Sequence, residues 1–307
     1  MTVRELAEGQ DADVVVVVRG RRPHGDGLVL SVGDRSGSMS AVVPEEVAAG
    51  ARCEPGAVLR LAGMHRGGRL EVCRLRAARE DEYRLEDLID GPPRSAAGME
   101  ADLRELVSTV QDPHLRALLD AVLGPDAPAW PQFRDAPAAK RYHQAYRHGL
   151  LEHSLGVAQA VSAISATFPG IDRDVAVTGA LLHDIGKLEA YTADPLAIDM
   201  TDLGRLQGEI PLGYYRIRRL IEDIPGFPAQ LAAAVLHIIL AHHGTLEHGS
   251  PVVPCTREAT LVHMIDNLGG RLGSFDRLEK ELPDGSRWSP FDRALAGSAW
   301  FGERQAA

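Results

Sequence analysis

A histidine followed directly by an aspartate stands at the end of the apolar stretch Ala-Leu-Leu-His-Asp-Ile-Gly-Lys, residues 180–187. His183 offers a neutral nitrogen and Asp184 an anionic oxygen, two kinds of donor that a single divalent cation accepts. Successive residues on a helix lie about 100° apart, so the two side chains converge only on a group at the helix edge. The dipeptide also arises by chance in a chain of 307 residues, so a metal site needs further donors.

Two predicted helices direct donors towards the core. Residues 174–187 are predicted to form a helix on which small residues, Gly179 among them, lie on the side of His183. Small side chains let a second helix approach closely, as a ligand set shared between helices requires. Residues 149–166 are predicted as another helix, and His153 shares its apolar stripe. A lone inward histidine is usually a satisfied core residue, so His153 by itself does not establish a site.

Two further predicted helices carry the remaining donors. Residues 228–243 begin with proline and stop before a glycine, which places His242 and His243 at a helix end. Residues 256–272 follow a capping threonine, and Asp266 falls on the buried side of this helix. An inward aspartate without a basic partner is costly unless a cation meets it. Four donor groups on four helices therefore predict a metal site.

The composition limits which metal and which class of protein are expected. Nine of the 12 histidines fall between residues 143 and 263, whereas the three cysteines form no CxxC pair. Zinc held by thiolates and a disulfide framework are therefore not expected. The net charge of -10 argues against nonspecific coating of nucleic acid by the overall field, although it allows a local basic groove. The sequence lacks an apolar run of the ~20 residues that a membrane helix needs and a signal peptide, so we expect a cytoplasmic protein with no membrane partner.

The elements before the helices read as a separate domain. Five short segments rich in β-branched residues are separated by turn residues, namely residues 13–19, 27–32, 38–43, 57–63 and 69–74. They predict a small closed barrel of the oligonucleotide-binding (OB) type, with an unrelated small barrel or sandwich as the alternative. We predict a multidomain α and β chain with an OB-like barrel over residues 1–83 and a linker over 84–98. Residues 99–307 are predicted to form an all-α bundle, helical to its end.

The order His153, His183-Asp184, Asp266 resembles the HD-domain metal-dependent phosphohydrolases. Flanking segments narrow the resemblance, because residues 137–143, 149–153, 181–187 and 242–251 are similar to those of the YhaM-type 3′→5′ exoribonucleases. That family pairs an N-terminal OB domain with a C-terminal HD domain. The resemblance spans most of the chain, with its specificity in the helical half and only a pattern match in the barrel.

The resemblance implies a metal-dependent 3′→5′ exonuclease that hydrolyses phosphodiester bonds of single-stranded RNA, and in some members DNA. Manganese is the expected ion, with Fe²⁺, Mg²⁺ and Zn²⁺ as alternatives, because imidazole and carboxylate donors accept all of them. One or two such ions acidify water and stabilise charge on phosphoryl oxygens. An assembly of identical chains is compatible with the sequence.

The resemblance also assigns roles to individual residues. The primary metal ligands it implies are His153, His183, Asp184 and Asp266. His242 and His243 are assigned to a second ion, and Asp184 is expected to bridge the two ions and orient the hydroxide. Lys187 or Arg147 is expected near the scissile phosphate, whereas the general acid has no candidate.

The chain departs from the family pattern at two positions in the helical half. Glu209 stands where the family has a histidine that binds the second metal. A carboxylate still ligates and favours a harder ion such as Mn²⁺ or Mg²⁺, or else the second ion is lost and the activity with it. Gly269 replaces a family aspartate three residues after Asp266, which alters a neighbouring contact only.

The barrel departs from the pattern of domains that grip single strands by stacking. It contains no phenylalanine, tyrosine or tryptophan before Tyr83, and base stacking on such residues is worth ~1–3 kcal/mol per base. Arginines are the predicted substitutes, with solvated surface residues as an equal alternative: Arg19, Arg21, Arg22, Arg66 and Arg69. Lys140 and His143, in a segment similar to the family's, are the other predicted nucleic-acid contacts.

Two other functions remain open from the sequence. The acidic net charge and the aromatic-free barrel motivate a phosphohydrolase that acts on nucleotides or short oligonucleotides. A nucleic-acid-binding regulatory protein is the third hypothesis, in which Glu209 marks a degraded metal site.

Overall fold

The computed structural model describes residues 1–49, 52–89, 91–140, 144–282 and 285–302. Internal contacts divide the chain into two compact units, which are described separately here. The first unit comprises Met1–Gly91 together with Asp194–Ala197, and the second comprises Pro92–Ala193 together with Ile198–Ala307.

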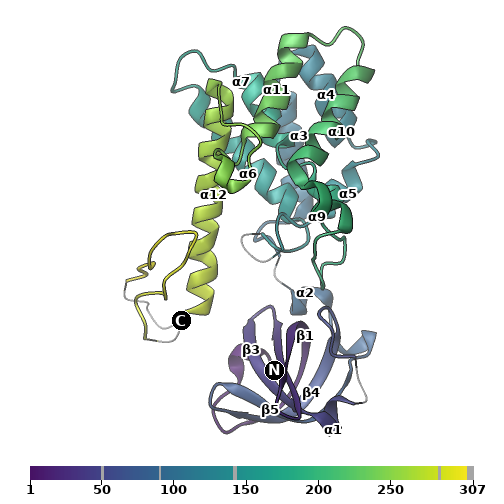
Figure 1. Ribbon diagram of the computed structural model, residues 1–307, viewed down its shortest axis with the longest axis vertical. Helices are drawn as coiled ribbons and strands as arrows, with labels where there is room; N and C mark the ends of the chain where they lie inside the picture. The colour runs from purple at the N-terminus through teal and green to yellow at the C-terminus, as the bar shows by residue number, and fades with distance from the viewer. Residues whose placement is uncertain (50–51, 90, 141–143, 283–284, 303–307) are drawn as a thin grey trace. The chain divides into compact units, whose positions relative to one another are not determined.

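The first unit is a closed five-stranded barrel (Figure 1). Its strands are β1 (Asp11–His24), β2 (Gly27–Asp34), β3 (Gly37–Pro44), β4 (Val58–Arg66) and β5 (Arg69–Ala77). The order around the barrel is β1-β2-β3-β5-β4, and β1 pairs with β4 to close it. All neighbours are antiparallel except β3 and β5, which pair in parallel. The predicted N-terminal barrel is confirmed, and five strands in this Greek-key order are those of an OB fold.

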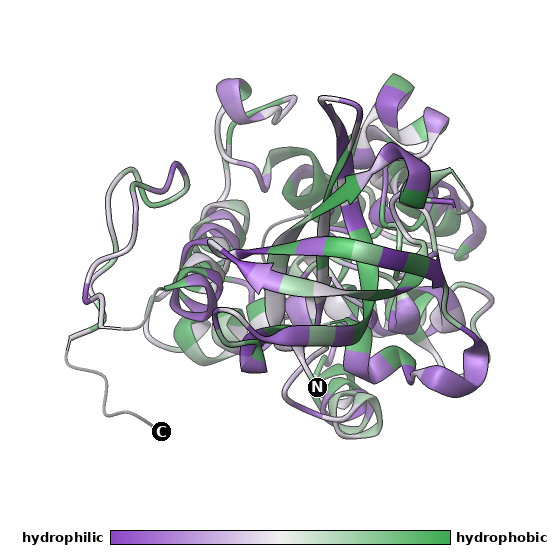
Figure 2. Cartoon of the chain, turned by 90° about the horizontal axis from the view of Figure 1, so that it is seen from below, coloured by the Kyte–Doolittle hydropathy of each residue, from purple (hydrophilic) through white to green (hydrophobic). Residues whose placement is uncertain are grey.

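The barrel interior is filled by alternate residues of each strand. On β1 the side chains of Val14, Val16 and Val18 are 2%, 0% and 0% exposed, whereas Asp13 faces solvent. Hydrophobic and hydrophilic residues accordingly follow one another along the strands (Figure 2). The strand β4 bends at Gly63, where the register with β5 shifts, and a Cβ there would lie 2.1 Å from a backbone oxygen of β5. Only glycine fits this bulge.

In the described residues of the second unit, the regular elements are helices, apart from isolated β-bridges. Its helices are α3 (Ala96–Ser108), α4 (Pro113–Leu123), α5 (Trp130–Asp135), α6 (Gly149–Ser165), α7 (Arg173–Leu182), α8 (Lys187–Ala190), α9 (Asp202–Gln207), α10 (Glu209–Asp223), α11 (Ala229–Ala241) and α12 (Arg257–Glu281). The stretch predicted as a linker includes the one-turn helix α2 (Leu85–Leu88) and the first residues of α3, and the domain boundaries stay a prediction. In the parts of the chain that are described, none of the helices combines the length and apolar character needed to cross a bilayer.

The helices α6, α11 and α12 pack around α7 and position its C-terminal end. Both α6 and α11 contact α7, and α12 packs against α6 and α7 (Figure 1). Gly179 of α7 makes the approach of α11 possible, because a Cβ at this position would lie 2.3 Å from Ile238 Cδ1. The small residue predicted to admit a second helix therefore does so.

Two predicted helix ends and the predicted helical tail are wrong. The helix predicted over residues 174–187 ends at Leu182, so that His183 and Asp184 lie in a turn before α8. The helix predicted to end at residue 272 continues to Glu281. The tail predicted as helical instead forms isolated β-bridges that join Trp288 to Trp300 and Asp292 to Gly297. Its glycines, Pro290 and short polar stretches do not sustain a helical apolar period.

Candidate metal centre

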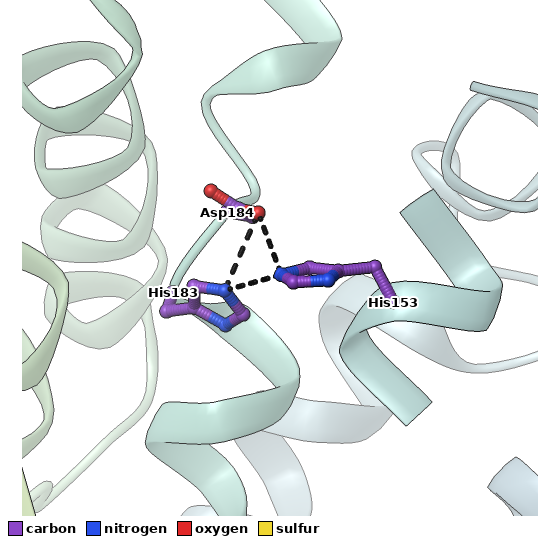
Figure 3. A group of neighbouring side chains, drawn as sticks. All are labelled: His153, His183 and Asp184. Carbon is purple, nitrogen blue, oxygen red and sulfur yellow. Dashed lines mark hydrogen bonds and ion pairs between the residues drawn. The ribbon is translucent and has the colours of Figure 1, made fainter. Parts of the chain in front are cut away.

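Three side chains meet at the end of α7, one from α6 and two from the turn that follows α7. Nε2 of His153 lies 3.2 Å from Nε2 of His183, and both nitrogens lie 3.3 Å from Oδ2 of Asp184. Figure 3 shows the three side chains turned towards one another, with His153 on one helix and the pair at the end of another. All three residues are buried. Among the described residues, the ligand atoms of these three lie within 4.8 Å of one another, close enough to bind one metal ion.

A fourth donor reaches the group from α12. Oδ1 of Asp266 lies 3.0 Å from Nε2 of His153 and 3.8 Å from Nε2 of His183. Two ligands ~2.1 Å from a common ion are separated by about 3.0 Å at a right angle and about 3.4 Å at the tetrahedral angle. The distances among His153, His183 and Asp184, and that from Asp266 to His153, fall around these values. The structure thus brings three of the expected primary ligands into one cluster and places the fourth, Asp266, against both histidines.

The helix ends determine which nitrogen each histidine presents. His183 and His242 are the C-terminal cap residues of α7 and α11, where backbone carbonyls lack partners within the helix. His183 donates Nδ1–H to the carbonyl of Ala180 (2.7 Å), and His242 donates Nδ1–H to that of Ile239 (2.8 Å). With the proton on Nδ1, the lone pair of each neutral ring lies on Nε2. Each ring is therefore set to ligate through Nε2.

The two oxygens of Asp184 face different groups. Oδ2 accepts a hydrogen bond from Nζ of Lys187 (2.6 Å) and faces the Nε2 atoms of His153 and His183. Oδ1 lies 3.6 Å from Nε2 of His242, and both atoms are buried without a hydrogen-bond partner in the described chain. A buried acceptor facing a second acceptor is unfavourable unless a cation lies between them. A cation at this position would satisfy both atoms, and Asp184 Oδ1 and His242 Nε2 would be its ligands.

Electrostatics keep the centre charged. Burial raises the pKa of Asp184, but the ammonium of Lys187 and the nearby His183 outweigh burial and hold this pKa well below its ordinary value. Burial lowers the pKa of Lys187, and the charge of Asp184 more than reverses this effect. For Asp266 burial is likewise outweighed, by the neighbouring His153 and His183, so its pKa is also lowered. Both carboxylates are thus ionised at neutral pH, as metal ligands must be.

The second predicted group lies beside the first. His242 is 1% exposed, and its ring centroid lies 4.9 Å from that of His183. Nε2 of His243 lies 3.8 Å from Oε1 of Glu209, the first residue of α10. Burial and the neighbouring His242 lower the pKa of His243, which favours the neutral form that binds metal. Histidine and carboxylate donors therefore face each other at this position.

Residues that the sequence did not single out hold the ligands in place. His263 of α12 donates Nδ1–H to the carbonyl of His242 (2.8 Å), and its ring fills the space where a Cβ of Gly244 would lie. Gly244 has φ +82°, which suits glycine at the end of α11. His243 donates to the carbonyl of His248 (2.9 Å). The only sequence signal for His263 and His248 was that both belong to the nine clustered histidines. The sequence does not distinguish a histidine that supports a ligand from one that only packs in the core.

Other predicted site residues have partners outside the cluster. Arg147 pairs with Asp135 (2.7 Å), and Lys140 pairs with Asp199 (2.6 Å). His143 lies outside the described residues, so its predicted contact with nucleic acid stays a prediction.

The barrel arginines fall into two groups. Arg19 donates to Ser38 and to the carbonyl of Asp34, and Arg21 pairs with Glu54, so these two guanidinium groups have partners within the barrel. The remaining three are Arg22, Arg66 and Arg69, and all five arginines are exposed.

Comparisons with known proteins agree with this geometry. Residues 150–270 match the family model described as HD domain. The chain is 29% identical to the 3′-5′ exoribonuclease YhaM of Geobacillus sp. (strain WCH70) over 266 residues, which cover 83% of this chain and 80% of that protein. The matched HD region contains every ligand of the cluster described above.

Proposed function

Because this chain belongs to the YhaM-type family of HD-domain proteins, we propose that it is a 3′→5′ exonuclease of single-stranded RNA. Its helical unit is a metal-dependent hydrolase of the HD type. The direction and the RNA substrate are the proposal, supported by the likeness to a named exoribonuclease. The observation that carries the proposal is the convergence of His153, His183, Asp184 and Asp266 within 3.0–3.8 Å contacts.

The ligands proposed for the first ion are these four residues. Imidazole and carboxylate donors without thiolates suit Mn²⁺, with Fe²⁺, Mg²⁺ and Zn²⁺ as weaker candidates. When bound, such an ion acidifies water to a hydroxide near neutral pH and neutralises charge on phosphoryl oxygens.

The protein groups orient the reacting atoms. Lys187 holds Oδ2 of Asp184 through a 2.6 Å hydrogen bond, which fixes the plane of the carboxylate. Oδ1 is thereby directed at His242, where it would serve as a metal ligand and orient the attacking water. The buried walls of the site exclude bulk water, which strengthens these interactions. We assign contact with the scissile phosphate to Lys187 or Arg147.

We propose that His242, His243 and Glu209 hold a second ion. The support is the orphaned pair formed by Asp184 Oδ1 and His242 Nε2, together with the carboxylate of Glu209 facing His243. A carboxylate in place of an imidazole favours a harder ion, so this position should prefer Mn²⁺ or Mg²⁺ over Zn²⁺.

The assay uses a 5′-labelled 20-nucleotide RNA with Mn²⁺, Mg²⁺ or chelator, and the same strand as DNA. A 3′→5′ exonuclease gives a ladder of shortening labelled products with Mn²⁺, and neither chelator nor a blocked 3′ end permits it. Asp266→Asn should abolish the ladder, and Asp276→Asn, an exposed position on the same helix, should leave it unchanged. Internal cleavage of a strand blocked at its 3′ end would contradict the exonuclease assignment.

A phosphohydrolase acting on nucleotides or short oligonucleotides is the second candidate. The barrel favours it in two respects, because it lacks aromatic residues before Tyr83 and because Arg19 and Arg21 are engaged within the barrel. Comparing kcat/KM for a dinucleotide and the 20-nucleotide strand separates the two. An exonuclease that tracks along a strand prefers the longer substrate, whereas the phosphohydrolase prefers the dinucleotide. Protein that binds RNA but neither retains an ion nor hydrolyses either substrate would be the regulatory protein instead.

A further inference from the structure

The partner of His153 distinguishes it from the other histidines of the centre. Nδ1 of His183, of His242 and of His243 each faces a backbone carbonyl. Nδ1 of His153 instead lies 3.1 Å from the side-chain oxygen Oε1 of Gln144. A carbonyl is always an acceptor, whereas an amide offers either an acceptor or a donor, so here a side chain decides where the imidazole proton lies.

We propose that Gln144 is a positioning residue that fixes the tautomer and orientation of His153 and thereby sets the affinity for the first metal ion. This inference rests on the proposed function. With Oε1 accepting from Nδ1–H, the lone pair of His153 lies on Nε2, the atom that faces His183, Asp184 and Asp266. If the amide turned its NH₂ group to the ring, the proton would move to Nε2 and occupy the position of the ion.

The backbone around Gln144 is built to hold this side chain in place. Gln144 has φ 55°, a left-handed conformation that non-glycine residues rarely adopt. Its carbonyl accepts a hydrogen bond from the backbone N–H of Ala138 (3.1 Å). Gly149, the first residue of α6, lies so close that a Cβ there would be 2.0 Å from the same carbonyl oxygen. An unfavourable backbone conformation persists only where the surroundings over-determine it, and such residues cluster at functional sites.

The left-handed backbone makes a clean deletion of the side chain possible. Gln144→Gly removes the amide while glycine adopts φ 55° without strain, so the variant should fold at least as well as the wild type. Gln144→Glu keeps an acceptor oxygen at the same distance from the backbone. Gln159→Ala is the matched control, because it removes a side-chain amide from the exposed face of α6, the helix that carries His153.

Two measurements test the inference. The nitrogen-15 chemical shifts of histidine rings in the metal-free protein report the tautomer, with His153 identified by comparison with His153→Asn. Competition of Mn²⁺ or Co²⁺ with a chelator gives the dissociation constant. We expect Gln144→Gly to lose the Nδ1–H tautomer of His153 and to bind the ion ~10–100-fold more weakly. Gln144→Glu should retain the tautomer and bind at least as tightly as the wild type, and Gln159→Ala should change neither property.

Gln144→Gly with wild-type tautomer and affinity would overturn the inference. The same holds if Gln144→Glu loses as much affinity as Gln144→Gly, because then the acceptor oxygen is not what matters. Failure of the wild type to bind any ion is a separate outcome. It contradicts the proposed function, and the tautomer comparison in the metal-free protein then decides the role of Gln144 alone.

Discussion

The buried ion pair between Asp184 and Lys187 ties the proposed chemistry to the stability of the helical unit. Asp184 is 2% exposed and Lys187 9%, and their charged atoms are 2.6 Å apart. Asp184→Asn should abolish hydrolysis, because it removes the proposed bridging carboxylate. It should also destabilise the protein, because the ammonium of Lys187 then stays buried with a neutral partner.

The size of this destabilisation follows from burial. Removing one partner of a buried pair costs about 3–5 kcal/mol. Lys187 also interacts with Asp266 and Glu209, which compensate part of the loss, so we expect about 3 kcal/mol for Asp184→Asn. Lys187→Met leaves Asp184 among histidines and should cost about 2 kcal/mol. The double variant should cost about 3 kcal/mol, which gives a coupling free energy of about 2 kcal/mol.

The assay is urea unfolding of the metal-free protein in chelator, followed by tryptophan fluorescence. The three tryptophans are Trp130, Trp288 and Trp300, all in the second unit, so the signal reports on the helical unit alone. Restricting the measurement to one unit also makes a two-state treatment reasonable. Additive effects of the two substitutions, with a coupling below about 0.5 kcal/mol, would refute the reasoning that the pair is a buried unit.

Three other predictions follow from single contacts. Gly244→Ala should cost about 2 kcal/mol in unfolding free energy and weaken metal binding, because its Cβ would lie 2.1 Å from the ring of His263. A Cβ at Gly249, which has φ +87°, would meet no atom within 4 Å. Gly249→Ala should therefore cost only the backbone strain of a left-handed alanine, without the clash. Glu209→Ala should reduce bound Mn²⁺ at saturation from two ions to one, whereas Glu209→His should keep two; equal stoichiometry in both would remove Glu209 from the site. Hydrogen bonds from Arg76 and neighbouring donors hold the pKa of Glu82 below its ordinary value, so Glu82 contributes stability above its unfolded pKa and loses it in acid. In urea, monitored by circular dichroism, Glu82→Gln should therefore be less stable than the wild type at pH 7, and this difference should shrink below about pH 4.

The sequence predicted the barrel and the helices because both follow from local periodicity. The strands were readable from short runs of β-branched residues, such as the five valines of residues 14–18, and the helices from apolar residues every three or four positions. The position of Asp266 on the inner side of its helix was likewise readable, since that side is fixed by the residues one turn away.

The geometry of the centre was less predictable, because it depends on how the helices end. A continuous helix through His183 would not leave the carbonyl of Ala180 for its Nδ1–H, and the turn after Leu182 was not visible in an unbroken apolar run. Gln144 was missed because its contact with His153 requires a left-handed backbone outside any regular element. Such conformations are set by tertiary contacts, which no local pattern records.

Anomalous diffraction from crystals grown with Mn²⁺ tests the central claim most directly. We expect a peak within ~2.0–2.3 Å of donor atoms of His153, His183, Asp184 and Asp266, with a second peak next to Asp184 and His242. Data at saturating Mn²⁺ with no peak at these four residues would contradict the account.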